Sequence, residues 1–437
     1  MGRNLYTVAL VVLLSTLCAA DKGIYGKHRS VHASVATPCN PTTSVGLLIQ
    51  GSTVTSYVPN GNFDVSSTTT GLQVVPLEPT GSPVSVATAN VVNSCVANST
   101  TGEAVCTANN TDVYTLMGST LTHTLTSSAD QGFNNSGGTC FNCGVIIDMA
   151  ANKALISIGL STSPSGSAYQ YLDLTANTFA TPIPTVNEIA ENFLYDSQRA
   201  LLLSPTEAGV YDIFKASSGS LTEYEMPLAG SPNTDSAGED CTTGISLVPV
   251  EFSSNLYLSD LTQAVFTPGS PGTWTAPTAL INIPEWTIYD GPESGLDGVA
   301  IAGTTHLGIV LGEYPFPIPP NYANAVMVVQ LPSTSGSGTP ALVDYAVALL
   351  PNDPDGNTFS IGCDPHTVAA YVSPNSGKAL GVVSDYGALP CYTISAPSGT
   401  PQYEALIDLA GVLAAPRTGG HTVTGSISSF VTFVATH

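Results

Sequence analysis

The segment Asp364–Val383, DPHTVAAYVSPNSGKALGVV, decides the fold because two short apolar stretches flank a turn in it. The turn, Pro374–Lys378, is rich in residues that favour chain reversal. The stretches on both sides alternate with a period of two, which is typical of half-buried antiparallel strands. The segment therefore predicts a hairpin within a β structure.

The same pattern recurs along the chain at intervals of roughly fifty residues, the period of four-stranded propeller blades. Clear copies begin at Gly144 and at Phe193. A stretch at 313–358, rich in Pro, Gly and Ser, lengthens the last interval. The equivalent second-strand positions are Val105, Leu155, Leu201, Leu256, Leu307 and Leu380.

The repeat predicts an all-β fold, a seven-bladed β-propeller of four-stranded antiparallel blades. We expect the chain ends to build the seventh blade together. Val45–Ile49 and Thr53–Val58 have the pattern of a third and a fourth strand, whereas His421–Gly425 and Phe430–Val434 have that of a first and a second. Such a shared blade closes the ring and removes a free sheet edge. Eight blades are the alternative, if residues 313–358 contain another one.

Two of the copies resemble a known family of repeats. Asp364–Val383, with its Pro-His start and its Pro-Asn-Ser-Gly-Lys turn, and Asp148–Ile156 are similar to the repeats of YVTN/NHL-type β-propellers. The literal Tyr-Val-Thr-Asn motif is missing from the sequence. The resemblance implies a propeller over residues 43–437, but the family spans many functions, so it implies little about activity.

Charge restricts the class of partner. The 437 residues include 9 Lys and Arg against 32 Asp and Glu, which gives a formal net charge of −23. A nucleic-acid-binding protein needs clustered cations that neutralise phosphates, and this chain has too few for that. We expect a protein or a small molecule as the ligand, no nucleic acid, and a monomer.

The N-terminus has the features of an export signal. Arg3 precedes the apolar run Leu5–Leu17, which is too short to span a bilayer and is followed by Cys18-Ala19-Ala20. We expect a signal peptide at 1–20, a flexible leader at 21–42 and a single propeller domain at 43–437. No later stretch is apolar enough for a membrane span, so the prediction is a secreted, periplasmic or cell-surface protein. Lipoprotein processing at Cys18 is the weaker alternative.

Eight cysteines remain after the expected cleavage, and an oxidising compartment favours disulfides between them. Two of the candidate pairs flank hairpin turns. The Cys-x-x-Cys pair fits a tight disulfide or half of a zinc site, and we favour the disulfide because no second metal-binding pair accompanies it. The candidate pairs are Cys95–Cys106, Cys363–Cys391 and Cys140–Cys143.

The repeat register also predicts a site at a mouth of the central channel, because the first strand of each blade lines that channel. Asp297, His366 and His421 would come from neighbouring blades and bring two imidazoles to one carboxylate. That set suits a divalent metal such as zinc, or general acid–base chemistry. The structural alternative is that each imidazole bonds the backbone of the adjacent blade. Further residues expected at this mouth are Cys143, Asn192, Thr243 and Asp364.

A second candidate metal site lies in Asn352–Asn357. Asp353, Asp355 and Asn357 alternate oxygen side chains around a Gly, as at the start of a calcium loop. Asp364 occupies the place of the last ligand only in part, and an Asx/Gly turn explains the same residues. A divalent cation, calcium or zinc, is the one cofactor that the sequence suggests.

The leading functional hypothesis is an exported propeller that acts as a binding or interaction module. The alternative is a metal-dependent hydrolase of the lactonase type, in which the channel-mouth metal holds the substrate carbonyl. A redox-cofactor propeller ranks lower because the sequence contains no Cys-x-x-Cys-His motif.

Overall fold

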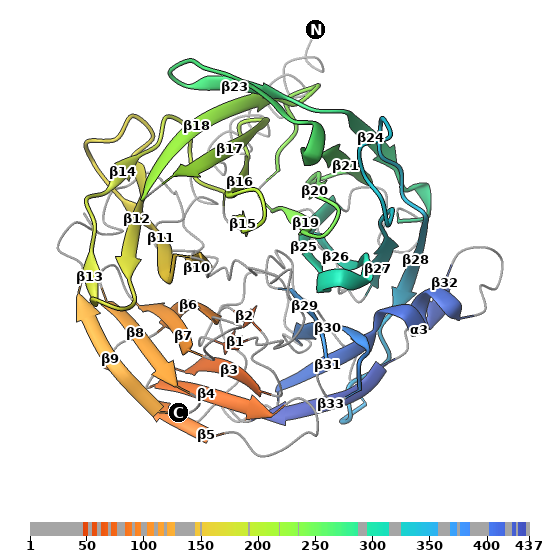
Figure 1. Ribbon diagram of the computed structural model, residues 1–437. Helices are drawn as coiled ribbons and strands as arrows, with labels where there is room; N and C mark the ends of the chain where they lie inside the picture. The colour runs from red at the N-terminus through yellow and green to blue at the C-terminus, as the bar shows by residue number, and fades with distance from the viewer. Residues whose placement is uncertain are drawn as a thin grey trace, which may run out of the picture.

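The computed structural model is a ring of β-sheets, with the first strand of each sheet nearest the centre (Figure 1). Six of its sheets have four or more strands and form the blades. The structure describes residues 47–50, 55–58, 63–68, 71–76, 84–89, 92–97, 103–108, 112–117, 120–126, 145–148, 151–190, 193–217, 219–234, 236–286, 295–313, 325–356, 368–373, 376–384, 402–415, 422–424 and 427–433.

Blades 1 to 3 follow one another along the chain, and each contains an antiparallel array of four consecutive strands or more. Blade 1 contains β6 (Val92–Ala97), β7 (Glu103–Ala108), β8 (Asp112–Met117) and β9 (Thr120–Thr126). Blade 2 contains β10 (Val145–Asp148), β11 (Lys153–Gly159), β12 (Ser167–Asp173), β13 (Thr178–Phe179) and β14 (Ile183–Pro184). Blade 3 contains β15 (Leu194–Asp196), β16 (Leu201–Thr206), β17 (Val210–Ser217) and β18 (Ser220–Pro227), extended by β23 (Gly272–Thr275) and β22 (Val265–Thr267).

Blades 4 to 6 follow blade 3 along the chain and around the ring (Figure 1). Blade 4 contains β19 (Gly238–Asp240), β20 (Ile245–Pro249), β21 (Asn255–Asp260) and β24 (Thr278–Asn282). Blade 5 contains β25 (Gly295–Ile301), β26 (Leu307–Glu313), β27 (Ala325–Gln330) and β28 (Asp344–Leu349), extended by β32 (Thr422–Thr424). Blade 6 contains β29 (Ala369–Val372), β30 (Ala379–Ser384), β31 (Gln402–Asp408) and β33 (Ile427–Phe433).

The expectation of seven four-stranded blades, with a blade shared by the two chain ends, is wrong. The N-terminal strands form two smaller sheets, one of β1 (Leu47–Gln50) and β2 (Thr55–Val58), the other of β3 (Phe63–Thr68), β4 (Gly71–Pro76) and β5 (Val84–Ala87). The C-terminal strands pair elsewhere: β32 lies parallel to β28, and β33 lies antiparallel to β31. Among the described residues, no sheet combines strands from both ends. The reason is that blade 6 has only three strands before α3 (Leu409–Ala414), so β33 fills its outer place.

The repeat itself is confirmed at five of its six second-strand positions. Leu256 is the exception, because it lies in β21, the third strand of blade 4. The first strand of that blade, β19, has only three residues, Gly238, Glu239 and Asp240, and shows no apolar alternation. The stretch at 313–358 contains the third and fourth strands of blade 5, not an eighth blade.

Contact between neighbouring blades builds the core. In β11, Ala154 and Ile156 pack into the cluster shared with blade 1, whereas Leu155 packs into the cluster shared with blade 3. In β20, Leu247 packs toward blade 5 and Val248 toward blade 3. Both faces of an inner strand are therefore buried, because each blade lies between two others.

Two segments cross from one blade to the next. The hairpin β22–β23 leaves blade 4 after β21 and pairs in parallel with β18 of blade 3, where Tyr224 lies opposite Gly272. Trp274 of this hairpin is 1% exposed, its Nε1 donates to the carbonyl oxygen of Tyr211 at 2.8 Å, and its ring meets that of Tyr211 edge-on. Strand β32 makes a comparable parallel addition to blade 5. Within the described part of the chain, no helix is long and apolar enough to cross a membrane.

We expect Trp274→Ala to lower the free energy of unfolding by about 3–5 kcal/mol, because it empties a buried site and removes the bond to Tyr211. Leu280→Ala, at a side chain that is 54% exposed, is the control and should change it by less than about 0.5 kcal/mol. Urea denaturation measures both. Equal effects of the two substitutions would contradict a structural role for the β22–β23 hairpin.

Candidate functional site

The turn between the first and second strands repeats its geometry from blade to blade. An aspartate ends the first strand of three successive blades, and the fourth residue after it has a positive φ. Blades 5 and 6 keep the positive φ but replace the aspartate with Ala302 and Ser373. The aspartates and their positive-φ residues are Asp148 with Asn152 (φ 49°), Asp196 with Ala200 (φ 54°) and Asp240 with Gly244 (φ 72°). In blades 5 and 6 the positive-φ residues are His306 (φ 59°), four residues after Ala302, and Gly377 (φ 70°), four residues after Ser373.

One carboxylate oxygen of each aspartate caps its own turn. Asp148 Oδ1 accepts from the backbone N–H of Ala151 at 3.1 Å. Asp196 Oδ1 accepts from the backbone N–H groups of Gln198 and Arg199 at 2.9 and 3.1 Å, and Asp240 Oδ1 from that of Thr242 at 3.0 Å. The aspartate therefore satisfies backbone donors that the tight turn leaves open.

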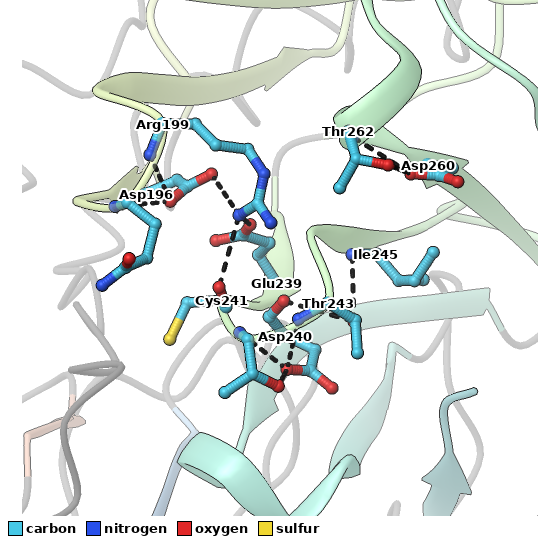
Figure 2. Close-up of polar contacts among 11 residues, drawn as sticks. Asp196, Arg199, Glu239, Asp240, Cys241, Thr243, Ile245, Asp260 and Thr262 are labelled. Atoms are coloured by element: carbon cyan, nitrogen blue, oxygen red, sulfur yellow. Dashed lines mark hydrogen bonds and ion pairs between the residues drawn. The ribbon is translucent and has the colours of Figure 1, made fainter. Parts of the chain in front are cut away.

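The other oxygen reaches a side chain that bridges to the next blade, and we call these three contacts the latches. Tyr195 of blade 3 donates to Asp148 Oδ2 at 3.0 Å. Arg199 Nη1 contacts Asp196 Oδ2 at 3.0 Å and Glu239 Oε1 of blade 4 at 3.1 Å (Figure 2). His306 Nδ1 of blade 5 contacts Asp240 Oδ2. The latches follow one another around the end of the ring.

The central latch buries charge. Asp196 and Glu239 are 0% and 2% exposed, and Arg199 also donates to the carbonyl oxygen of Cys241 at 3.3 Å (Figure 2). Burial and the neighbouring Asp196 charge raise the pKa of Glu239 well above its usual range, while Arg199 acts in the opposite direction. Arg199 is therefore the cation that offsets the cost of burying the carboxyl groups of Asp196 and Glu239.

Strand order assigns the ionisable residues at strand ends and in turns to one of two faces of the propeller. We call the end with these first-to-second-strand turns the turn face, and the opposite end, where first strands begin, the acidic face. All described lysines and arginines lie on the turn face: Arg199, Lys153 at the start of β11, Lys215 near the end of β17 and Lys378 before β30. His306 lies there as well.

The acidic face contains no Lys or Arg within the described part of the chain. Its carboxylates lie in the linkers between blades and in the turns between second and third strands. Glu207 and Asp355 are exposed, and Glu188 is half-buried. Further carboxylates at this end are Asp112, Glu251, Glu285, Asp297 and Asp353. The described cations are therefore confined to one end of the propeller, whereas carboxylates lie at both ends.

Most of the expected channel-mouth residues cannot be placed. Asn192, Asp364, His366 and His421 lie outside the described residues, as does Cys143. Asp297 is 1% exposed within β25, at an irregular register.

The repeat register predicted that residues just before each first strand lie at one mouth of the channel, and this reasoning fails at two positions. Thr243 lies in the turn after β19, at the end of the blade opposite to the one expected. The strand that follows His421, β32, is the outer strand of blade 5 and not a first strand, so the argument that placed His421 at the mouth loses its basis.

The metal sites predicted from the sequence stay predictions. Of the calcium candidate, Asp353 is 7% exposed, Asp355 is exposed, and Asn357 lies outside the described residues. The Asp353 carbonyl accepts from the Gly356 N–H at 2.9 Å, as in a turn. No three His, Cys, Asp or Glu side chains in the described ranges are grouped so that they could hold a metal ion.

The disulfide expectation is confirmed for one pair. Cys95 and Cys106 lie opposite each other in β6 and β7, are 0% exposed and form a disulfide. Cys241, next to the central latch, is also disulfide-bonded. The pairs Cys140–Cys143 and Cys363–Cys391 lie outside the described residues.

Comparison with known proteins gives structural similarities only, and both are at low sequence identity. No family model and no curated protein matches the chain. A functionally unknown protein from Desulfotomaculum acetoxidans is 13% identical, with a TM-score of 0.49 over 82% of this chain and 96% of that one. A chain of the mitotic checkpoint complex is 9% identical, with a TM-score of 0.48 over 80% of this chain and 88% of that one. Neither similarity indicates a function for this chain.

We expect Arg199→Leu to lower the free energy of unfolding by about 3 kcal/mol, because it leaves two buried carboxyls without a cation. The loss should grow once the pH rises past the raised pKa that Glu239 has in the parent. Without Arg199 the pKa of Glu239 rises further, so above that point the variant alone still holds a proton that the unfolded state releases. Urea denaturation over a series of increasing pH values measures the difference. Lys378→Ala, which breaks the half-exposed ion pair with Asp408, is the control and should cost less than about 1 kcal/mol throughout the series.

Ala200 and Gly244 hold the same positive-φ turn position, the first with a Cβ and the second without one. Ala200→Gly should stabilise the protein by about 0.5–1 kcal/mol, because it relieves a left-handed backbone that disfavours a Cβ. Gly244→Ala should destabilise it by more than about 1 kcal/mol, since the new Cβ would lie 2.4 Å from the Arg199 guanidinium carbon. Thermal denaturation of both variants checks the pair, and a shift of the same sign in both would contradict the shared turn geometry.

Proposed function

We propose that the protein is an exported β-propeller binding module that recruits a basic protein or peptide on its acidic face. The observation that carries the proposal is the distribution of cations: every described Lys and Arg lies on the turn face, so the charged side chains described on the acidic face are carboxylates from several blades. A surface of one sign favours partners of the opposite sign and accelerates their association.

Export rests on the sequence of the N-terminus and gains support from the buried Cys95–Cys106 disulfide, since disulfides persist in oxidising compartments. Membership of the YVTN/NHL-type propellers is part of the same proposal and rests on the repeats at Asp148–Ile156 and Asp364–Val383.

The rigid ring suits this role because its blades are buried on both faces and its loops are free to vary. Linkers and turns at one end of such a ring form a continuous surface without disturbing the core. On the turn face, by contrast, Asp148, Asp196 and Asp240 are engaged in turn caps and latches. Glu207 and Asp355 are exposed on the acidic face, so their carboxylates are the candidates for recognition.

A direct test uses fluorescein-labelled octalysine as the probe and fluorescence anisotropy as the measurement. We expect binding at low ionic strength that weakens steeply as salt is added. The triple variant Glu188→Gln, Glu207→Gln, Asp355→Asn should weaken binding by roughly tenfold.

The matched control neutralises three carboxylates of the turn face, with Glu103→Gln, Asp173→Asn and Asp344→Asn. Its net charge equals that of the first variant, and its affinity should stay within about twofold of the parent. Equal losses in the two variants would show that octalysine responds to net charge alone, and this would refute a specific acidic face.

A further inference from the structure

The turn between β20 and β21, on the acidic face, presents an aromatic side chain from a backbone conformation that disfavours one. Phe252 has a φ of 54°, in the left-handed region, and is 54% exposed. A left-handed backbone is unfavourable for a residue with a Cβ, and it is a genuine outlier for a bulky one. Leaving an aromatic ring in water is unfavourable as well. The turn therefore bears two free-energy costs at one residue.

Glycine avoids the first of these costs in the corresponding turns of two other blades. Gly166 (φ 78°) comes directly before β12 of blade 2, and Gly209 (φ 74°) comes directly before β17 of blade 3. Neither has a Cβ, so the left-handed backbone is adopted without strain. Among the described turns between second and third strands, only that of blade 4 has a residue with a side chain at positive φ. Stability of the fold alone would favour glycine in place of Phe252.

Contacts on both sides hold this turn in place. The N–H of Glu251 donates to the carbonyl oxygen of Asn233, in the linker between blades 3 and 4, at 3.1 Å. On the other side, β25 of blade 5 begins so close to the turn that a Cβ added at Gly295 would lie 2.0 Å from the backbone nitrogen of Phe252. The turn has no room to relax toward blade 5, and the ring is therefore presented from a fixed backbone.

The carboxylates of the acidic face include two at this junction. Glu251 precedes the aromatic residue in the chain and is half-buried. Glu285 precedes Trp286, whose Nε1 donates to the carbonyl oxygen of Gly295 at 3.2 Å. Its Oε2 accepts from the hydroxyl of Tyr345 at 2.7 Å. No Lys or Arg of the described ranges lies on this face, so the described part of the chain supplies no cation for the ring, and a partner can.

We infer that Phe252 is an anchor on the acidic face for an arginine side chain of the basic partner. A guanidinium is planar and weakly hydrated, so it stacks on an aromatic ring while its N–H groups donate to carboxylates of the same junction. The ammonium of lysine is more strongly hydrated and gains less from the ring. The inference rests on the proposed function and refines it, because it names the side chain that the acidic face selects. A role in binding also accounts for a costly side chain at this turn.

The test compares fluorescein-labelled octaarginine with octalysine, two probes of equal charge, by fluorescence anisotropy on the full chain. We expect the parent to bind octaarginine roughly fivefold more tightly than octalysine. Phe252→Gly leaves the net charge unchanged and should reduce this ratio to about twofold or less, because the arginine probe loses the ring. The same substitution should raise the midpoint of thermal denaturation, since glycine relieves the left-handed backbone.

Phe252→Leu is the second variant and keeps an apolar side chain at the turn. It should lower the ratio as well, because it removes the aromatic face to which a cation is attracted. Leu280→Ala is the matched control. It removes a side chain of equal exposure, 54%, from the outer strand of the same blade, and its ratio should equal that of the parent.

The outcomes separate this inference from the proposed function. If the parent binds both probes and the ratio is the same in Phe252→Gly, the anchor is overturned and the proposed function stands. If the parent binds neither probe, both are overturned. An equal fall of the ratio in Leu280→Ala, or a lower denaturation midpoint in Phe252→Gly, would also overturn the anchor, because the first would show a general effect of exposed apolar surface and the second a structural role of the ring.

Discussion

The contact of one blade with the next is the constraint on which the molecule depends. Because a blade lies between two neighbours, its inner strands bury side chains on both faces, as Leu247 and Val248 do in β20. Water then reaches the inner sheets mainly at the strand ends. This is why the ionisable residues collect at the two ends of the ring.

The two ends deal with buried carboxylates in different ways. On the turn face, each aspartate divides its oxygens between its own turn and a bridging side chain, and Arg199 compensates the most buried pair. Near the acidic face, Asp212 and its neighbours have only the amide of Asn187 and backbone N–H groups. On the turn face a cation therefore offsets the buried carboxylates, whereas near the acidic face neutral donors contact them.

The sequence predicted the repeat and its propeller architecture, because apolar alternation and turn residues recur wherever a hairpin is buried between blades. It failed where local pattern does not decide pairing. The sequence pattern of β32 and β33 predicted the first two strands of a further blade, yet the two strands form the outer edges of blades 5 and 6. Leu256 was misplaced by one strand because β19 contains two acidic residues and no apolar ones.

The latches were missed as well, although an aspartate four residues before a turn's positive-φ position recurs in the sequence at Asp148, Asp196 and Asp240. Asp212, Glu223 and Glu225 come together through the pairing of β17 with β18, a register that the repeat pattern did not indicate.

The hairpin that crosses from blade 4 to blade 3 has a consequence for how the chain reaches its native state. Residues 265–275 supply the outer strands of blade 3, but they are synthesised only after the first three strands of blade 4. Blade 3 is thus incomplete when its own four strands leave the ribosome. The aromatic contacts of Tyr211 with Trp274 and of Tyr224 with Phe266 form only after the hairpin has been synthesised. Because blade 3 takes its outermost strands from the connection inside blade 4, its sheet is complete only after β21 has been synthesised, and the two blades share a segment that spans more than one repeat.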